Sequence, residues 1–264
     1  MAEQPVAPWP AFELCPGAAT SGVIFICDHA SPAVPEAYAG LGLAPEAFTR
    51  HIAYDIGAAA LTRALAARFE APAVLSHFSR LLIDPNRGLD DPTLIMELSD
   101  GAIIPGNHGI TEGERATRIA QFWQPYRHAV QAEIARMVAT GPVPAIVSLH
   151  SFTPRWKGAR RPWPVAVLWD TDARMALPLI ADLRTDHGMN VGDNQPYDGA
   201  LKGDTLHEMA TVPGLPHVLI ELRQDEIGDD AGVARWTSRL EAALRPLLVQ
   251  AGLHQMVPQG SRAR

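Results

Sequence analysis

The chain has 264 residues, of which 47% are hydrophobic and 19% are charged, so it can bury the core of one large α/β domain or two small ones. Its net charge of −7 argues against nucleic acid or an anionic membrane as a partner. The two cysteines make no disulfide framework, and no run of about 18 apolar residues suggests a membrane span. The N-terminus lacks the pattern of a signal peptide, so we expect a cytoplasmic protein.

The first half of the chain predicts an irregular arm, short buried strands and one long helix. Brief apolar runs are typical of strands buried on both faces of a parallel sheet. Proline is tolerated in a first helical turn, and an Ala- and Leu-rich stretch favours helix. In order, we expect an arm over 1–21, a strand over 23–27, a helix over 45–69, a strand over 73–76, a short buried strand over 81–83 and a long loop over 88–114.

The second half continues the alternation of helices and strands. Apolar side chains at helical spacing predict a helix that Gly141 and Pro142 end. Pro246 is expected to interrupt or kink the last helix. In order, we expect a helix over 114–139, a strand over 145–149, a basic loop over 153–163, a strand over 164–169, a helix capped by 170–172 and ended by Gly188, a turn-rich loop over 191–205, a strand over 217–222, a helix over 230–250 and a loose tail over 255–264.

This alternation predicts the fold class. Strands that alternate with helices form a mostly parallel sheet with helices on both faces. No internal repeat, low-complexity block or linker divides the chain. We therefore expect residues 1–264 to form a single three-layer α/β domain.

Three apolar runs end in polar groups that could bind a metal or move a proton. His29 and His150 each follow a predicted strand, and Glu221 ends another. Ligands bind beyond the carboxyl ends of strands in open α/β sheets, so neighbouring strands would bring both imidazoles to one ion. A catalytic zinc takes three protein ligands, and Asp55, a lone carboxylate in an apolar stretch, is a candidate for the third.

Each of these residues also has a simpler interpretation. A histidine after a strand can be a hydrogen-bonded loop residue, and Asp55 could pair with Arg80. His51 lies four residues before Asp55, on the same face of the predicted helix, and is a competing ligand. Glu221 in an apolar cavity could have a raised pKa and act as a general base, but it could also pair with Arg223.

Further charged residues could line a substrate site. Arg80 and Arg87 could hold an anionic substrate through paired hydrogen bonds, although Arg80 could instead pair with Asp84. His207 and Lys202 lie in a turn-rich loop before the Glu221 strand and could line a cleft. For Lys202, solvation in the loop is the alternative.

Several familiar catalytic motifs are absent from the sequence. It has neither His-Glu-x-x-His nor Cys-x-x-Cys, so no local motif by itself indicates zinc. It also lacks a Gly-x-Ser-x-Gly elbow, a Gly-x-Gly-x-x-Gly turn and a P-loop. These absences argue against a serine nucleophile and a nucleotide cofactor.

The order of five short blocks resembles the N-formylglutamate amidohydrolase family over about residues 22–248. The blocks are Asp-His-Ala-Ser at 28–31, Asp55 among small residues, Ser-Arg-Leu-Leu-Ile-Asp-Pro-Asn-Arg at 79–87, Leu-His-Ser-Phe at 149–152 and Glu-Leu-Arg-Gln at 221–224. Better-known members have a Ser-His-Gly-Gly type of turn in place of 28–31, and the loops 88–114 and 153–163 also differ. These departures bear on the substrate more than on the reaction.

The resemblance implies a phosphorylase/hydrolase-like α/β fold, which zinc carboxypeptidases and zinc-dependent cell-wall amidases share. It implies a divalent metal cofactor, expected to be Zn²⁺. Carried over by their order, the metal ligands would be His29, Asp55 and His150, and Glu221 would be the base.

Our hypothesis from the sequence is hydrolysis of the N-acyl bond of an acidic amino acid, with N-formyl-L-glutamate giving formate and glutamate. Arg80, Asn86, Arg87 and Ser151 would contact this small anionic substrate, and His207 or an arginine would stabilise the oxyanion. One alternative is a metal amidase that acts on another N-acyl amino acid or on a cell-wall peptide amide. Another is a non-catalytic protein that binds small acids.

Overall fold

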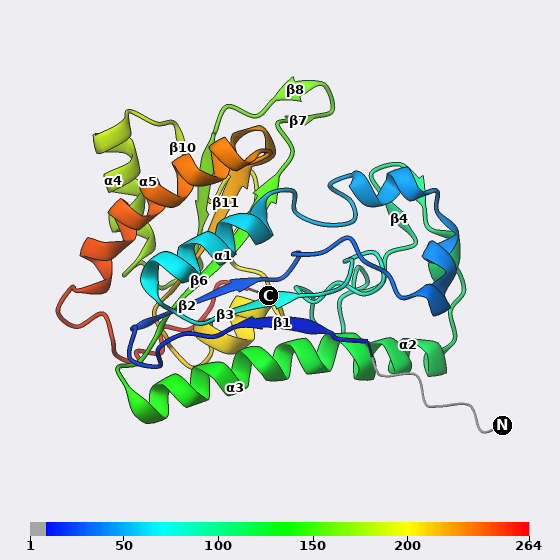
Figure 1. Ribbon diagram of the computed structural model, residues 1–264, viewed down its shortest axis with the longest axis horizontal. Helices are drawn as coiled ribbons and strands as arrows, with labels where there is room; N and C mark the ends of the chain where they lie inside the picture. The colour runs from blue at the N-terminus through cyan, green and yellow to red at the C-terminus, as the bar shows by residue number, and fades with distance from the viewer. Residues whose placement is uncertain (1–8, 264) are drawn as a thin grey trace.

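A computed structural model describes residues 9–263, and a seven-stranded sheet in the order β1-β3-β2-β6-β11-β9-β10 runs through its centre (Figure 1). The strands β3, β2, β6 and β11 are parallel, whereas β1 pairs antiparallel with β3 and β9 pairs antiparallel with β11. The mostly parallel sheet is thus confirmed, with two antiparallel pairings. The strands are β1 (Phe12–Cys15), β2 (Val23–Cys27), β3 (Ala73–Ser76), β6 (Ala145–Phe152), β9 (Val165–Leu168), β10 (Val191–Asp193) and β11 (His217–Arg223).

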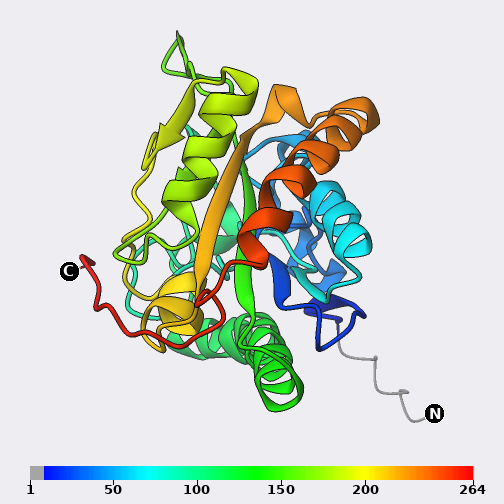
Figure 2. The ribbon, with the colours of Figure 1, turned by 90° about the vertical axis from the view of Figure 1, so that its left-hand side faces the viewer.

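Helices cover both faces of this sheet, which confirms the three-layer α/β architecture (Figures 1 and 2). Apolar residues of α1, α4 and α5 pack on one face, and α3 packs on the other. The helices are α1 (Ala58–Phe69), α2 (Glu112–Arg118), α3 (Gln124–Thr140), α4 (Ala176–His187) and α5 (Asp230–Leu248). The short 3-10 turns are η1 (Glu36–Gly42), η2 (Pro45–Thr49), η3 (Pro105–Asn107) and η6 (Gln224–Glu226). The π turns are η4 (Ile119–Trp123) and η5 (His207–Thr211). Two small hairpins are β4–β5 (Leu98–Ser99, Ala102–Ile103) and β7–β8 (Arg155–Trp156, Ala159–Arg160).

The predicted strands of the central sheet are confirmed, and β6 is longer than expected. It continues to Phe152 and pairs with β11 from Ile146↔His217 to Phe152↔Arg223. His150 and Ser151 therefore lie within the strand rather than after it. This long pairing fixes the position of His150 relative to Glu221, its partner in the register.

The helix predicted over 45–69 is wrong in its first half. The helix begins at Ala58, after Gly57 with a φ of 83°, a left-handed conformation that glycine adopts without strain. A Cβ at this glycine would lie 2.1 Å from the backbone oxygen of Ile227, so only glycine fits at this position. Asp55 consequently lies before the helix, and His51 does not share a helix face with it.

Other differences from the sequence predictions are local. Residues 81–83 are buried but form no strand, and the first two belong to a turn. The helix expected over 114–139 runs from Glu112 through the η4 π turn to Thr140. The helix expected after 170–172 begins at Ala176, because Asp172 instead accepts hydrogen bonds from Arg174.

The two ends of the chain extend the sheet or pack beside it. Residues 9–21 of the predicted arm include β1, and residues 1–8 lie outside the described part. Near the other end, Ser261 and Arg262 hydrogen-bond to Asp170, and the Arg262 guanidinium also binds Asp198 at 2.8 Å. Within residues 9–263, no helix is long and apolar enough to cross a bilayer.

Candidate active site

Four candidate catalytic or metal-binding side chains come from two central strands, from the end of a third strand and from the segment before α1. His29 lies two residues after β2, His150 lies on β6, and Glu221 lies on β11 directly opposite His150. Asp55 belongs to the irregular segment before α1, and its backbone N–H donates to the His29 carbonyl at 2.9 Å. All four residues are buried. The sheet therefore brings together the residues that the sequence singled out.

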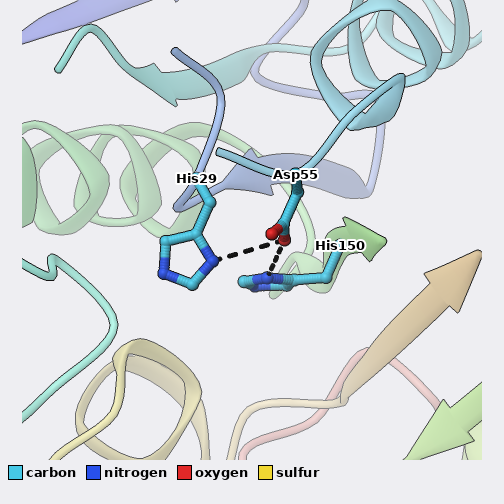
Figure 3. A group of neighbouring side chains, drawn as sticks. All are labelled: His29, Asp55 and His150. Atoms are coloured by element: carbon cyan, nitrogen blue, oxygen red, sulfur yellow. Dashed lines mark hydrogen bonds and ion pairs between the residues drawn. The ribbon is translucent and has the colours of Figure 1, made fainter. Parts of the chain in front are cut away.

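Two histidines and one aspartate converge on a single point (Figure 3). One carboxylate oxygen of Asp55, Oδ2, lies 3.3 Å from His29 Nδ1 and 2.8 Å from His150 Nδ1. Among the described residues, these three form the group whose possible ligand atoms all lie within 4.8 Å of one another. His51 is not in this group, and its Nε2 lies 3.4 Å from Asp100 instead.

The opposite nitrogen of each ring is held by a second carboxylate. His29 Nε2 lies 2.8 Å from Asp84 Oδ1, and His150 Nε2 lies 3.0 Å from Asp28 Oδ2. A carboxylate on one ring nitrogen fixes the tautomer and orientation of a ligating histidine. Both rings are thus oriented with Nδ1 toward the shared point.

These outer carboxylates are themselves held by several donors. Asp28 Oδ1 accepts hydrogen bonds from the hydroxyls of Tyr126 at 3.0 Å and Thr205 at 2.5 Å. Asp84 Oδ2 accepts from Arg80 Nε and Nη2 at 3.1 and 2.7 Å. The cluster is therefore rigid well beyond its innermost residues.

The pKa values of the cluster follow from opposing effects of burial and charge. Burial raises the pKa of Asp55 and of Asp84, but the neighbouring histidines and, for Asp84, Arg80 outweigh it and hold both carboxyls ionised. Burial lowers the pKa of His150, but hydrogen bonds to Asp28 and Asp55 raise it well above its ordinary value. The carboxylates of the cluster thus favour positive charge beside them, at the position of His150.

Glu221 differs from these paired groups. Its Oε2 is the buried side-chain atom that has no hydrogen-bond partner within the described residues. Burial raises the pKa of Glu221 to about 7, against the opposing charge of His150. Arg223, the alternative partner in the sequence, pairs with Asp225 and Glu226 instead. Glu221 is therefore free to accept or release a proton near neutral pH.

A cavity of about 440 Å³ opens onto the cluster. Arg80 and Arg87 line it, with Arg80 Nη1 3.9 Å from Asp55 Oδ1. Arg80 thus both pairs with Asp84 and borders the cavity, so the two interpretations of this residue are compatible. The other predicted site residues that line the cavity are His29, Asp55, Asn86, His150, Ser151 and Glu221.

Two predicted residues are not among those that line the cavity. His207 lies at the start of η5, where its Nδ1 accepts from the backbone N–H of Gly203 at 3.3 Å. Lys202 lies near Asp90, 4.0 Å away, on the exposed side of the same loop. Other residues of the same loop do line the cavity, among them Asp204, whose pKa burial raises to about 7.

The sequence interpretation missed the two outer carboxylates. Asp28 and Asp84 stand inside blocks that were noted for other residues, Asp28 directly before His29 and Asp84 between two arginines. For Asp28, the sequence signal that could have indicated its role was its position next to His29. Their contacts with the histidines depend on the register of β2, β3 and β6, which a single sequence does not give.

Comparison with protein families gives a match over most of the chain. A family model described as N-formylglutamate amidohydrolase matches residues 21–228. The matched range contains both histidines, Asp55 and Glu221. A search of curated protein sequences found no match.

Two solved structures are similar over nearly the whole chain. A gene product of Agrobacterium tumefaciens is 33% identical, with a TM-score of 0.85 over 90% of this chain and 94% of its own. An N-formylglutamate amidohydrolase from Ralstonia eutropha JMP134 is 21% identical, with a TM-score of 0.66 over 90% of this chain and 97% of its own. The second likeness concerns the fold alone.

Proposed function

The chain belongs to the N-formylglutamate amidohydrolase family, and from this premise we propose that it is a metal-dependent hydrolase of the N-acyl amide bond of an acidic amino acid. N-formyl-L-glutamate is the first substrate to test. The observation that carries the proposal is the convergence of His29, Asp55 and His150 beside the unpartnered carboxyl oxygen of Glu221. Such an arrangement suits a cation and a base acting on one water molecule.

The donor set fits a divalent cation. His29 and His150 would each provide Nδ1, and Asp55 would provide a carboxylate oxygen, a combination typical of zinc sites that keep one position open. When bound, the cation supplies Lewis acidity that polarises a carbonyl and lowers the pKa of water. Asp28 and Asp84 would keep both rings oriented for this role.

Glu221 is the proposed general base and acid. Its Oε2 would take a proton from the attacking water and then deliver it to the amide nitrogen as the C–N bond breaks. The products are a carboxylic acid and a free amine. A group whose pKa lies near the working pH performs both transfers efficiently, and the pKa of Glu221 is about 7.

Arg80 and Arg87 are the proposed partners of the substrate carboxylates. Arg80 is fixed by its two hydrogen bonds to Asp84, and its Nη1 remains on the cavity side. Arginine binds carboxylates through planar, directional hydrogen bonds, which would also position the amide. Asn86 and Ser151 also line the cavity and are further candidate contacts. His207 has no part in the proposal because it does not line the cavity.

Metal analysis combined with a hydrolysis assay tests this proposal. We expect the purified protein to contain about one divalent cation per chain, and to release formate and glutamate from N-formyl-L-glutamate until a chelator removes the metal. His29→Ala and His150→Ala should each lose both metal and activity. His108→Ala is the matched control, since His108 is exposed and pairs with Glu97. Hydrolysis that survives complete removal of the metal contradicts the proposal.

A further inference from the structure

One side of the cavity has no role in the hydrolysis proposed above. Three aromatic side chains line it, and three leucines lie among them. Phe152 is 2% exposed, whereas Trp156 and Tyr197 are 45% and 47% exposed. Exposed aromatic rings at the mouth of a buried cavity are typical of ligand contacts. The residues of this apolar wall are Phe152, Trp156, Leu168, Tyr197, Leu201 and Leu219.

The sheet order places two residues of this wall, Leu168 and Tyr197, across the cluster from the arginines. Phe152 and Leu219 lie on the same strands as His150 and Glu221. The segment with Arg80 and Arg87 follows β3, whereas Leu168 ends β9 and Tyr197 follows β10. The order β3-β2-β6-β11-β9-β10 puts the two histidines and Glu221 between them. A substrate held across the cavity would therefore have its carboxylates on one side of the scissile amide and its remaining group on the other.

A buried arginine holds the aromatic rings in place. The guanidinium of Arg161 lies 5.4, 5.6 and 5.3 Å from the ring centroids of Phe152, Trp156 and Tyr197. It also donates a hydrogen bond to the Tyr197 hydroxyl at 3.1 Å and another to the Thr153 carbonyl at 3.3 Å. Rings that are ordered before binding lose less entropy when a ligand arrives.

The charges on this side favour an apolar group over a second acid. Among the described residues that line the cavity, the lysines and arginines are Arg80 and Arg87, both on the far side. Asp198, which borders the apolar wall, is already paired with Arg262 at 2.8 Å. An anionic group here would lie near the Asp198 carboxylate, and Arg161, whose guanidinium contacts the rings, is not among the residues that line the cavity.

In an N-acyl amino acid, the group across the scissile bond from the carboxylates is the acyl group. A formyl group has no carbon beyond the carbonyl with which to contact the rings. Resting on the hydrolase function proposed above, we infer that the apolar wall is an acyl subsite. The substrate class is then an acidic amino acid whose nitrogen carries an aromatic or other large apolar acyl group.

A comparison of substrates that differ only in the acyl group tests this inference. Release of glutamate, the shared product, is measured from N-formyl-, N-acetyl- and N-benzoyl-L-glutamate. We expect kcat/KM to be at least about tenfold higher for the benzoyl compound than for the formyl compound, as burial of a ring allows. Trp156→Ala should reduce this benzoyl-to-formyl ratio about tenfold. Leu98→Ala, which truncates an exposed leucine away from the cavity, is the matched control and should leave the ratio unchanged.

The outcomes separate this inference from the proposed function. Equal or better hydrolysis of the formyl compound, or a Trp156→Ala variant with an unchanged ratio, overturns the acyl subsite while the hydrolase proposal stands. If no compound is hydrolysed, the hydrolase proposal fails, and calorimetry with N-benzoyl-L-glutamate decides on the subsite. Binding that Trp156→Ala weakens about tenfold supports it, and absence of binding, or binding that this variant leaves unchanged, overturns it.

Discussion

The cavity has two sides that are held in different ways. On the side of β2 and β6, the strand-fixed side, strand pairing and buried carboxylates fix the groups that line the cavity. On the side of β9 and β10, the loop-held side, the cavity is lined by loops, and arginines outside the cavity hold these loops. His150 is fixed by the β6–β11 register and by two carboxylates. Tyr197 and Asp198 are fixed by Arg161 and Arg262. Chemistry requires positions accurate to a fraction of an ångström, and strands provide them. Loops tolerate change, so we expect the choice of substrate to reside there.

The two sides also differ in how they would respond to mutation. A buried carboxylate such as Asp28 has partners from α3 and from the segment before η5 as well as from β6. Its loss would disturb several elements at once. The ion pair between Arg262 and Asp198 lies at the surface, where such pairs contribute little. The predictions below test this contrast, beginning on the strand-fixed side.

The largest effect is expected for Glu221→Gln. Glutamine keeps the shape of the side chain but cannot take a proton, so kcat should fall about 10²- to 10⁴-fold. The metal content should not change, because Glu221 is not one of the three converging side chains. Single-turnover kinetics together with metal analysis provide the measurement.

The matched control for this variant is Glu97→Gln, an exposed acid paired with His108, which should retain full activity. If Glu221→Gln hydrolyses the substrate at the wild-type rate, Glu221 is not the base. The strand-fixed side of the cavity would then have no assigned general base.

The second prediction concerns the pH dependence of stability, through Asp204 in the loop that borders the cavity. Burial raises the pKa of this carboxyl from 3.8 to about 7 in the folded chain. Between those values the folded chain binds a proton that the unfolded chain has lost, so stability falls as the pH rises through this range. Above about pH 7 the cost is constant, on the order of a few kcal/mol.

Asp204→Asn removes this cost and keeps the acceptor for the His207 backbone N–H. The variant should therefore become increasingly more stable than the unchanged chain between about pH 4 and pH 7, as measured by denaturant unfolding at a series of pH values. Asp230→Asn, an exposed acid at the start of α5, should show no such trend. A constant difference across the pH range contradicts a raised pKa at Asp204.

A third, smaller effect is expected from Asp28→Asn. The amide can still contact His150 Nε2 but carries no charge, so it orients the ring less strongly. Metal affinity should fall about 10- to 100-fold, as it does when such outer carboxylates are removed from other metal sites. Competition with a chelator of known affinity measures this directly.

Tyr126→Phe separates orientation of His150 from general support of the fold. It removes the hydrogen bond from Tyr126 to Asp28 but leaves the contact between Asp28 and His150 intact. We expect a much smaller loss of metal affinity than in Asp28→Asn. Equal losses in the two variants would mean that Asp28 acts through packing rather than through the histidine.

The same contrast explains how much a single sequence could predict. The runs over 23–27 and 218–220 are continuously apolar because both faces of the sheet are covered, so they identified their strands. The polar residues at the ends of these runs indicated the cluster, because ligands bind beyond the carboxyl ends of strands in open α/β sheets. The helix predicted over 45–69 failed because Gly57 turns the chain against Ile227, a contact between distant segments.

The loop-held side of the cavity could not be predicted from apolar runs or from the polar residues that end them. Arg161 reaches Tyr197 across 36 residues, and Arg262 reaches Asp198 across 64 residues. Nothing in the local sequence indicates such partners, because an arginine in a loop is usually solvated. The tail was accordingly expected to be loose, and its hydrogen bonds to Asp170 and Asp198 follow from the tertiary fold alone.

The smallest effect is expected from Arg262→Ala, which tests whether the end of the chain helps to hold the loop-held side. Arg262 donates to Asp198 at 2.8 and 3.2 Å and to the Trp169 carbonyl at 2.9 Å, but its side chain is 45% exposed. Its Nε also lies 3.3 Å from the buried Asp170, but in the variant this carboxylate keeps its hydrogen bonds from Ser261 and from the backbone N–H of residue 262. Loss of the exposed pair with Asp198 costs about 1 kcal/mol or less, so KM should rise by no more than about fivefold while kcat stays unchanged. Arg262→Lys keeps the charge and should recover part of the loss. A fall in kcat with KM unchanged would mean that the tail acts on the cluster itself, and the division of the cavity into a catalytic and a selecting side would have to be abandoned.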